Sequence, residues 1–226
     1  MESKIRDLRQ EIFKFEQLSN FDKNDFFVSE CNYFAFNLIK SWPNWEKKIL
    51  NIYGERKSGK SHLSEIFLEN KKGVKFKLKD LNNKIFGRIK EYENIVIEDF
   101  NERCDEEAAY SLIDMVEKEN KYLLITSVRA VNEMETRLKD LNSRFKNILT
   151  AKIDKPDDEL IQALIVKNFS DNQIILDEKL INFICKRITR SYEKISEFIC
   201  TIDEISLKKK KPINLKIIKE ILGASN

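Results

Sequence analysis

The stretch "GERKSGKSH", residues 54–62, directly follows the apolar run "KILNIY" and decides how the chain is interpreted. From Gly54 to Ser61 it fits the phosphate-loop pattern G-x-x-x-x-G-K-[ST]. In such a loop, backbone N–H groups and the start of the next helix hold phosphates, and Gly59 permits a close approach. Lys60 would contact the terminal phosphates and Ser61 would offer its hydroxyl to Mg2+. The competing interpretation is a polar turn that fits a loose pattern by coincidence.

Composition excludes several classes of protein. The chain has 226 residues, of which 42% are hydrophobic and 35% charged, as expected of a soluble globular protein. The formal net charge of +3 is too small to argue for a nucleic-acid partner. No apolar run approaches the ~18 residues of a membrane span, and the charged N-terminus lacks the apolar centre of a signal peptide. A cytoplasmic location is therefore expected.

Apolar strand-like runs alternate with helical periodicity as far as residue 154. The expected strands are residues 48–53, 74–79, 94–99, 122–127 and 148–153, and the expected helices are residues 22–44, 61–70, 80–92, 105–119 and 132–145. This alternation predicts an α/β fold, with a mainly parallel sheet flanked by helices on both faces.

Only helical periodicity follows Pro156. The expected helices are residues 157–169, 177–188, 192–207 and 214–222. The sequence therefore predicts an N-terminal arm (1–21), an α/β nucleotide-binding domain (22–154) and a small all-α lid domain (155–226).

Polar side chains end two of the apolar strands. Glu98 and Asp99 follow "NIVI", where Glu98 would hold Mg2+ and Asp99 would orient a water molecule. The strand "YLLITS" ends in Thr126 and Ser127, which could reach a terminal phosphate. The competing interpretation is that both strands end in solvated polar residues.

Two arginines are placed where a guanidinium could stabilise phosphate charge. Arg144 lies near the end of the α/β domain in "LKDLNSRF", and Arg190 begins a lid helix in "RITRSYEK". The alternative for Arg144 is a surface salt bridge.

Taken in order, these segments resemble the AAA+ ATPases of the DnaA family, and especially the short Hda-type regulators that inactivate DnaA. The motifs that carry the resemblance are "FFVSECN", "GERKSGKSH", "IVIEDF", "LLITSVRA", "RLKDLNSRF", "DKPDDELIQALIVKNF" and "RITRSYEKISEFICTID". The Hda type is favoured because "ILGASN" ends the sequence after the helical segment, without a DNA-reading helix-turn-helix.

The resemblance implies a role for each candidate residue. Gly54, Gly59, Lys60 and Ser61 would bind ADP or ATP with Mg2+. Phe27 and Val28 would lie against the adenine. Ser127 would belong to the first sensor, Arg190 would be the second sensor, and Arg144 would be an arginine finger acting in trans on DnaA-bound ATP. Glu98 departs from the Asp of most AAA+ strands, which argues against efficient hydrolysis by this chain itself.

The resemblance also implies partners. "QEIFKF" is similar to the peptides that dock on the DNA polymerase sliding clamp, with Gln10, Ile12, Phe13 and Phe15 as its contacts. The alternative is that these apolar side chains pack on the domain's own core. A homodimer is a further candidate assembly, and neither sequence-specific DNA binding nor a membrane partner is expected.

The resulting hypothesis is a negative regulator of replication initiation that stimulates hydrolysis of DnaA-bound ATP. Three alternatives stay open: an autonomous AAA+ ATPase that loads or remodels a substrate, a nucleic-acid-binding adaptor, and a small-molecule kinase. The lysine run Lys208–Lys211 motivates the adaptor, although such a run is more often a solvated loop.

Overall fold

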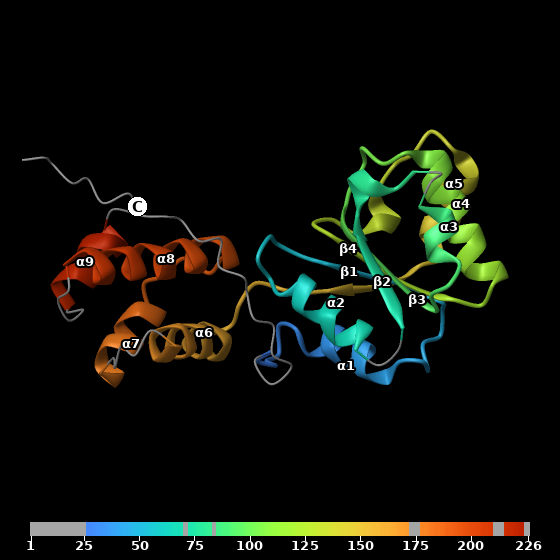
Figure 1. The fold of residues 1–226 in the computed structure, drawn as a ribbon. Helices are drawn as coiled ribbons and strands as arrows, with labels where there is room; N and C mark the ends of the chain where they lie inside the picture. Colours follow the sequence, from blue (N-terminus) through green and yellow to red (C-terminus); the bar gives the residue numbers. More distant parts are fainter. Residues whose placement is uncertain (1–25, 70–71, 83–84, 172–176, 210–214, 224–226) are drawn as a thin grey trace, which may run out of the picture.

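A five-stranded parallel sheet forms the centre of the α/β part of the chain (Figure 1). The computed structural model describes residues 26–69, 72–82, 85–171, 177–209 and 215–223. The strands are β1 (Ile49–Tyr53), β2 (Gly73–Lys77), β3 (Asn94–Phe100), β4 (Tyr122–Ser127) and β5 (Leu149–Lys152). Their spatial order is β2-β3-β4-β1-β5, and every neighbouring pair is parallel. The prediction of a parallel α/β sheet is confirmed.

Helices cover both faces of this sheet (Figure 1). Helices α1 (Tyr33–Ser41) and α2 (Lys60–Leu68) pack on the face that carries Leu50, Val96 and Leu124. The other face is covered by α3 (Phe86–Ile89), α4 (Glu106–Lys118) and α5 (Lys139–Lys146). Successive side chains of a strand point to opposite faces, so strands buried on both faces are apolar at nearly every position.

The chain leaves the sheet after β5, and the elements described after it are all helices, which share a core of their own (Figure 1). These helices are α6 (Asp158–Asp171), α7 (Glu178–Cys185), α8 (Tyr192–Lys209) and α9 (Leu215–Gly223). Their packed side chains include Ile161, Ile165, Phe169, Ile184, Phe198, Ile202 and Ile218. The expectation of an all-helical segment after the sheet is confirmed. We call α6–α9 the lid.

The helix expected over residues 132–145 is shorter in the structure. Val131–Glu133 forms a 3-10 turn (η3), and α5 begins only at Lys139. The Glu106 carboxylate accepts the backbone N–H groups of Arg137 and Leu138 at 3.0 and 2.9 Å, so these donors are satisfied by α4 instead of by helix bonds. A second 3-10 turn, η2 (Leu78–Asp80), follows β2.

The helix expected over residues 22–44 is also shorter. Residues before α1 form a turn in which Asn32 Nδ2 donates to the carbonyl of Phe27 and Asn32 Oδ1 accepts the N–H of Ser29. The helix ends at Ser41, shortly before Pro43, because a residue that precedes proline disfavours the helical conformation. Within the described ranges, no helix is both long and apolar enough to cross a lipid bilayer.

Candidate nucleotide-binding site

The loop between β1 and α2 has a backbone that requires its glycines. Gly59 has φ = +90°, and a Cβ built there would lie 3.0 Å from Cε2 of Phe26. A Cβ on Gly54 would lie 2.8 Å from the carbonyl oxygen of Ile153, the residue that directly follows β5. Both positions therefore exclude a side chain, for reasons of conformation or space. This is the geometry of a compact loop whose N–H groups lead into a helix N-terminus.

Lys60 closes the loop on itself. Its Nζ donates to the carbonyls of Gly54 at 2.9 Å and Glu55 at 2.6 Å, and to Oγ of Ser58 at 3.3 Å. The side chain is buried, with only 7% of the residue exposed. Burial lowers the pKa of Lys60 from 10.5 to about 8, although the nearby charges of Asp99 and Glu55 oppose this shift. Lys60 is thus a buried cation held by neutral acceptors that a phosphate could replace.

A cavity of about 1000 Å3 opens beside this loop. Its walls come from the loop and from the ends of β3 and β4. Cationic side chains line it from several elements, namely Arg56, Lys57, Lys60, Arg103 and Arg129. Ser61 and His62 of α2 also line it, and the His62 ring packs edge-on against Phe26 at 5.3 Å between centroids. The size and charge of the cavity suit a phosphorylated ligand.

The two acidic side chains at the end of β3, Glu98 and Asp99, have different surroundings. Asp99 lines the cavity and has φ = +58°, and the strand pairing is irregular between Ile97 and Phe100. Glu98 is buried on β3, where its Oε2 lies 3.9 Å from Nζ of Lys75. Glu98 does not line the cavity among the described residues, and its Oε1 is buried with no hydrogen-bond partner among them. Asp99 is therefore the acid that faces the loop.

These residues fit a nucleotide with Mg2+. The buried Lys60 ammonium and the loop N–H groups are donors for phosphate oxygens, and the Ser61 hydroxyl and a nearby carboxylate are the oxygen ligands that Mg2+ prefers. The orphaned Oε1 of Glu98 is a buried acceptor that a water molecule or cation could satisfy. In the described part of the chain, no group of three His, Cys, Asp or Glu side chains is placed to hold a metal.

At the end of β4, Thr126 faces the cavity and Ser127 does not line it. Thr126 Oγ1 accepts the backbone N–H of Asp99 at 3.3 Å, which joins the tips of β3 and β4. The Ser127 hydroxyl accepts from Asn51 Nδ2 at 2.9 Å and donates to the carbonyl of Arg129 at 2.6 Å. Of the two strand-end hydroxyls, Thr126 is thus the one that lines the cavity, and Ser127 supports the loop that follows.

Asn51 was not identified from the sequence, although a polar residue in the middle of "ILNIY" was an available signal. It is fully buried in the central strand β1. Its Nδ2 also donates to the carbonyl of Ile125, and its Oδ1 accepts the N–H of Val131, both at 3.0 Å. The amide therefore fixes the segment between β4 and η3, which carries Arg129 to the cavity rim.

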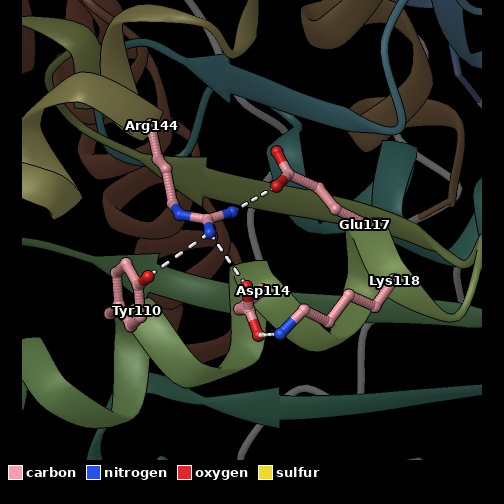
Figure 2. Close-up of polar contacts among 5 residues, drawn as sticks. All are labelled: Tyr110, Asp114, Glu117, Lys118 and Arg144. Carbon is pink, nitrogen blue, oxygen red and sulfur yellow. Dashed lines mark hydrogen bonds and ion pairs between the residues drawn. The ribbon is translucent and has the colours of Figure 1, made fainter.

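Arg144 projects from α5 toward α4 and is held there by three side chains (Figure 2). One terminal nitrogen pairs with Glu117, while Nη2 lies 2.9 Å from Asp114 Oδ1 and 3.4 Å from the Tyr110 hydroxyl. The guanidinium also stacks over the Tyr110 ring at 4.8 Å. The side chain remains 22% exposed and does not line the chain's own cavity.

The charges around Arg144 cancel. Lys118 pairs with Asp114 at 2.7 Å, so two cations meet two carboxylates in the cluster of Figure 2. The hydrogen bond to Tyr110, followed by the charges of Glu117 and Asp114, raises the pKa of Arg144, and the hydrogen bond from Lys118 lowers that of Asp114. The salt bridge expected as the alternative for Arg144 is therefore present.

The remaining predicted residues lie outside the cavity or outside the described structure. Arg190 is exposed and pairs with Asp158 of α6 at 2.8 Å. Phe27 is 44% exposed and Val28 half-buried, whereas Phe26 is the aromatic ring that covers Gly59. Gln10, Ile12, Phe13 and Phe15 fall in residues 1–25, outside the described residues, as do Lys210 and Lys211.

No protein-family model matches the chain. In sequence it is similar to the chromosomal replication initiator protein DnaA of Helicobacter hepaticus, with 24% identity over 88% of this chain and 49% of that protein. It is 26% identical to DnaA of Buchnera aphidicola (Baizongia pistaciae) over 93% of this chain and 52% of that protein. The chain thus spans about half the length of these curated relatives.

Solved structures agree with this similarity. Domain III of Thermotoga maritima DnaA superposes with a TM-score of 0.71 at 19% identity, covering 91% of this chain and 97% of that one. A mutant of the Thermotoga maritima protein RuvB superposes with a TM-score of 0.67 at 14% identity, covering 88% and 70%. The fold is that of an AAA+ ATPase. A DnaA structure with bound AMPPCP and single-stranded DNA superposes on this chain with a TM-score of 0.65 at 16% identity, covering 85% and 69%.

Proposed function

We propose that this chain is an adenine-nucleotide-binding regulator of replication initiation, which stimulates hydrolysis of DnaA-bound ATP by presenting Arg144 in trans. In this proposal ADP or ATP with Mg2+ occupies the cavity beside Lys60, and residues 10–15 dock on the sliding clamp. The similarity to DnaA and to AMPPCP-bound DnaA supports the nucleotide and the process.

The position of Arg144 carries the proposal. Its described contacts are all with α4, and it does not line the cavity of its own loop. An arginine that lies away from its own phosphate loop and is partly exposed at the domain surface supports a role at a neighbour's nucleotide. A guanidinium supplied in trans stabilises the transition-state charge of phosphoryl transfer and is worth ~10^3 to 10^5 in rate.

To act on a nucleotide bound by another protein, Arg144 needs a stable contact between the two proteins as well as its charge. In the proposal the clamp peptide supplies part of it, since clamp-bound chains are concentrated beside clamp-bound partners. Residues Gln10, Ile12, Phe13 and Phe15 would make this contact. A homodimer would use the same geometry with a second copy of the chain.

The test is single-turnover hydrolysis of ATP pre-bound to DnaA, with DNA-loaded clamp and increasing amounts of this protein. The chain should accelerate hydrolysis, Arg144→Ala should abolish the acceleration, and Arg88→Ala should retain it, because Arg88 is an exposed arginine on α3. Gln10→Ala with Phe13→Ala should lose the clamp dependence and keep the folded core. Loss of ADP binding by Arg144→Ala would contradict the in-trans role.

An autonomous ATPase is the second candidate, favoured by one observation. Asp99 and Thr126 line the same cavity as Lys60 and Ser61, so an acid and a hydroxyl face the chain's own phosphate loop. Steady ATP turnover by the chain alone, lost in Asp99→Asn and kept in Arg144→Ala, would favour this reading.

A further inference from the structure

Two side chains at the variable positions of the phosphate loop reach the lid. The Glu55 carboxylate accepts a hydrogen bond from the Ser191 hydroxyl and another from the backbone N–H of Tyr192 at 3.2 Å. Lys57 Nζ donates to Oγ of Ser196 at 3.0 Å. The phosphate loop is therefore itself a docking surface for the beginning of α8.

The Glu55 contact satisfies a general need of helix ends. The first N–H groups of a helix have no partner within it, and the N-terminus carries partial positive charge. Tyr192 is the first residue of α8, and the carboxylate that accepts its N–H comes from the other domain. The helix start and the loop thus stabilise each other across the domain boundary.

Tyr192 also ties the start of α8 to the segment that joins the two parts of the chain. The buried Tyr192 hydroxyl donates to the carbonyl of Asp154 at 3.1 Å, in the segment that joins β5 to α6, and lies 3.4 Å from Sγ of Cys31. Cys31 donates its N–H to Asp157, whose other carboxylate oxygen accepts the N–H of Leu160 in α6. Tyr192 anchors the lid at the chain connection, so that Glu55 can fix its orientation.

Glu55 also contacts Lys60, the lysine of the phosphate loop. The main-chain carbonyl of Glu55 accepts from Lys60 Nζ at 2.6 Å, while its side chain holds the lid. We propose that Glu55 is a latch that couples the phosphate loop to the lid, so that a bound nucleotide is retained while the latch is closed and is released when it opens. The latch rests on the proposed nucleotide site and adds a control of nucleotide release to it.

The experiment measures lid position and nucleotide release separately. A spin label on Cys200, an exposed cysteine of α8, is paired with one on Lys139→Cys in α5, in a Cys104→Ser, Cys185→Ser background. Electron–electron distance measurements on the nucleotide-free chain then give the position of the lid relative to the sheet domain. Stopped-flow displacement of fluorescent ADP gives the rate of nucleotide release.

Glu55→Gln should broaden the distance distribution and accelerate ADP release roughly 3- to 10-fold, the effect of losing a charge-assisted hydrogen bond. Ser191→Ala should have a smaller effect in the same direction, because the Tyr192 N–H still donates to Glu55. The double variant should show less than the sum of the two effects, because the Ser191 hydroxyl acts on the same carboxylate. Glu46→Gln, an exposed carboxylate before β1, is the matched control and should change neither readout.

An unchanged distance distribution in Glu55→Gln, with the chain folded by circular dichroism, would overturn the latch. Additive effects of Glu55→Gln and Ser191→Ala would overturn it as well, since they would then act separately. If the unsubstituted chain binds no ADP, the proposed function fails, while the distance measurement still decides whether Glu55 holds the lid.

Discussion

The low pKa of Lys60 predicts that ADP affinity falls as pH rises above neutrality. Burial lowers this pKa to about 8, and the ammonium must be charged to attract phosphate. Bound phosphates favour the charged form, so the complex keeps the proton that the free chain loses. Binding therefore takes up a proton above pH 8, and the affinity must decrease as the pH increases.

The size of the effect follows from the charged fraction of Lys60. With a pKa of about 8, that fraction falls from about nine-tenths at pH 7 to about one-tenth at pH 9. Apparent affinity is reduced in proportion to the competent fraction, so the dissociation constant for ADP should rise about tenfold, or about 1.4 kcal/mol. Lys60→Arg keeps a cation that does not titrate in this range, and should bind ADP with little pH dependence.

The assay is isothermal titration calorimetry with Mg-ADP at pH 7, 8 and 9, in buffers of different ionisation enthalpy to count protons directly. Uptake of a proton at pH 9 by the unsubstituted chain, and none by Lys60→Arg, is the expected pattern. A dissociation constant that stays flat between pH 7 and 9 would refute the reasoning. A slope that persists in Lys60→Arg would assign it to another group.

Three further outcomes are expected. Asp114→Asn with Glu117→Gln should free Arg144 from its ion pairs and lower the concentration of chain that half-maximally stimulates DnaA roughly 2- to 10-fold, measured in the same single-turnover assay. Gly59→Ala should lower the free energy of unfolding by ~1–3 kcal/mol in urea titrations, because alanine disfavours φ = +90°. Asn51→Leu should cost ~2–4 kcal/mol in the same titration by leaving buried backbone groups without partners, and an unchanged midpoint would contradict that account.

Local sequence determined the elements and the type of ligand site. Strands buried on both faces are apolar along their length. A glycine-lysine-serine loop after such a strand adopts a backbone conformation that its own residues specify. The sheet, the helical segment after it and the loop from Gly54 to Ser61 could therefore be predicted. The role proposed for Arg144 came from resemblance, not from periodicity.

Only the tertiary structure decided which polar side chain meets which. In β3 and β4 the side chain that faces the cavity depends on strand parity and on the irregular pairing between Ile97 and Phe100. Of the four strand-end residues considered from the sequence, Asp99 and Thr126 line the cavity, and Glu98 and Ser127 do not. The start of α5, the helix that carries Arg144, depended on the Glu106 carboxylate of α4, about 30 positions away in sequence.

The contact between Glu55 and α8 joins residues more than a hundred positions apart. At a variable loop position, nothing local distinguishes a solvated glutamate from one that holds a second domain. Periodicity and loop motifs are local properties that the sequence carries by itself. Contacts between residues that chain folding brings together, such as Glu55 with the lid or Arg144 with α4, can be identified only from the packing of the whole molecule.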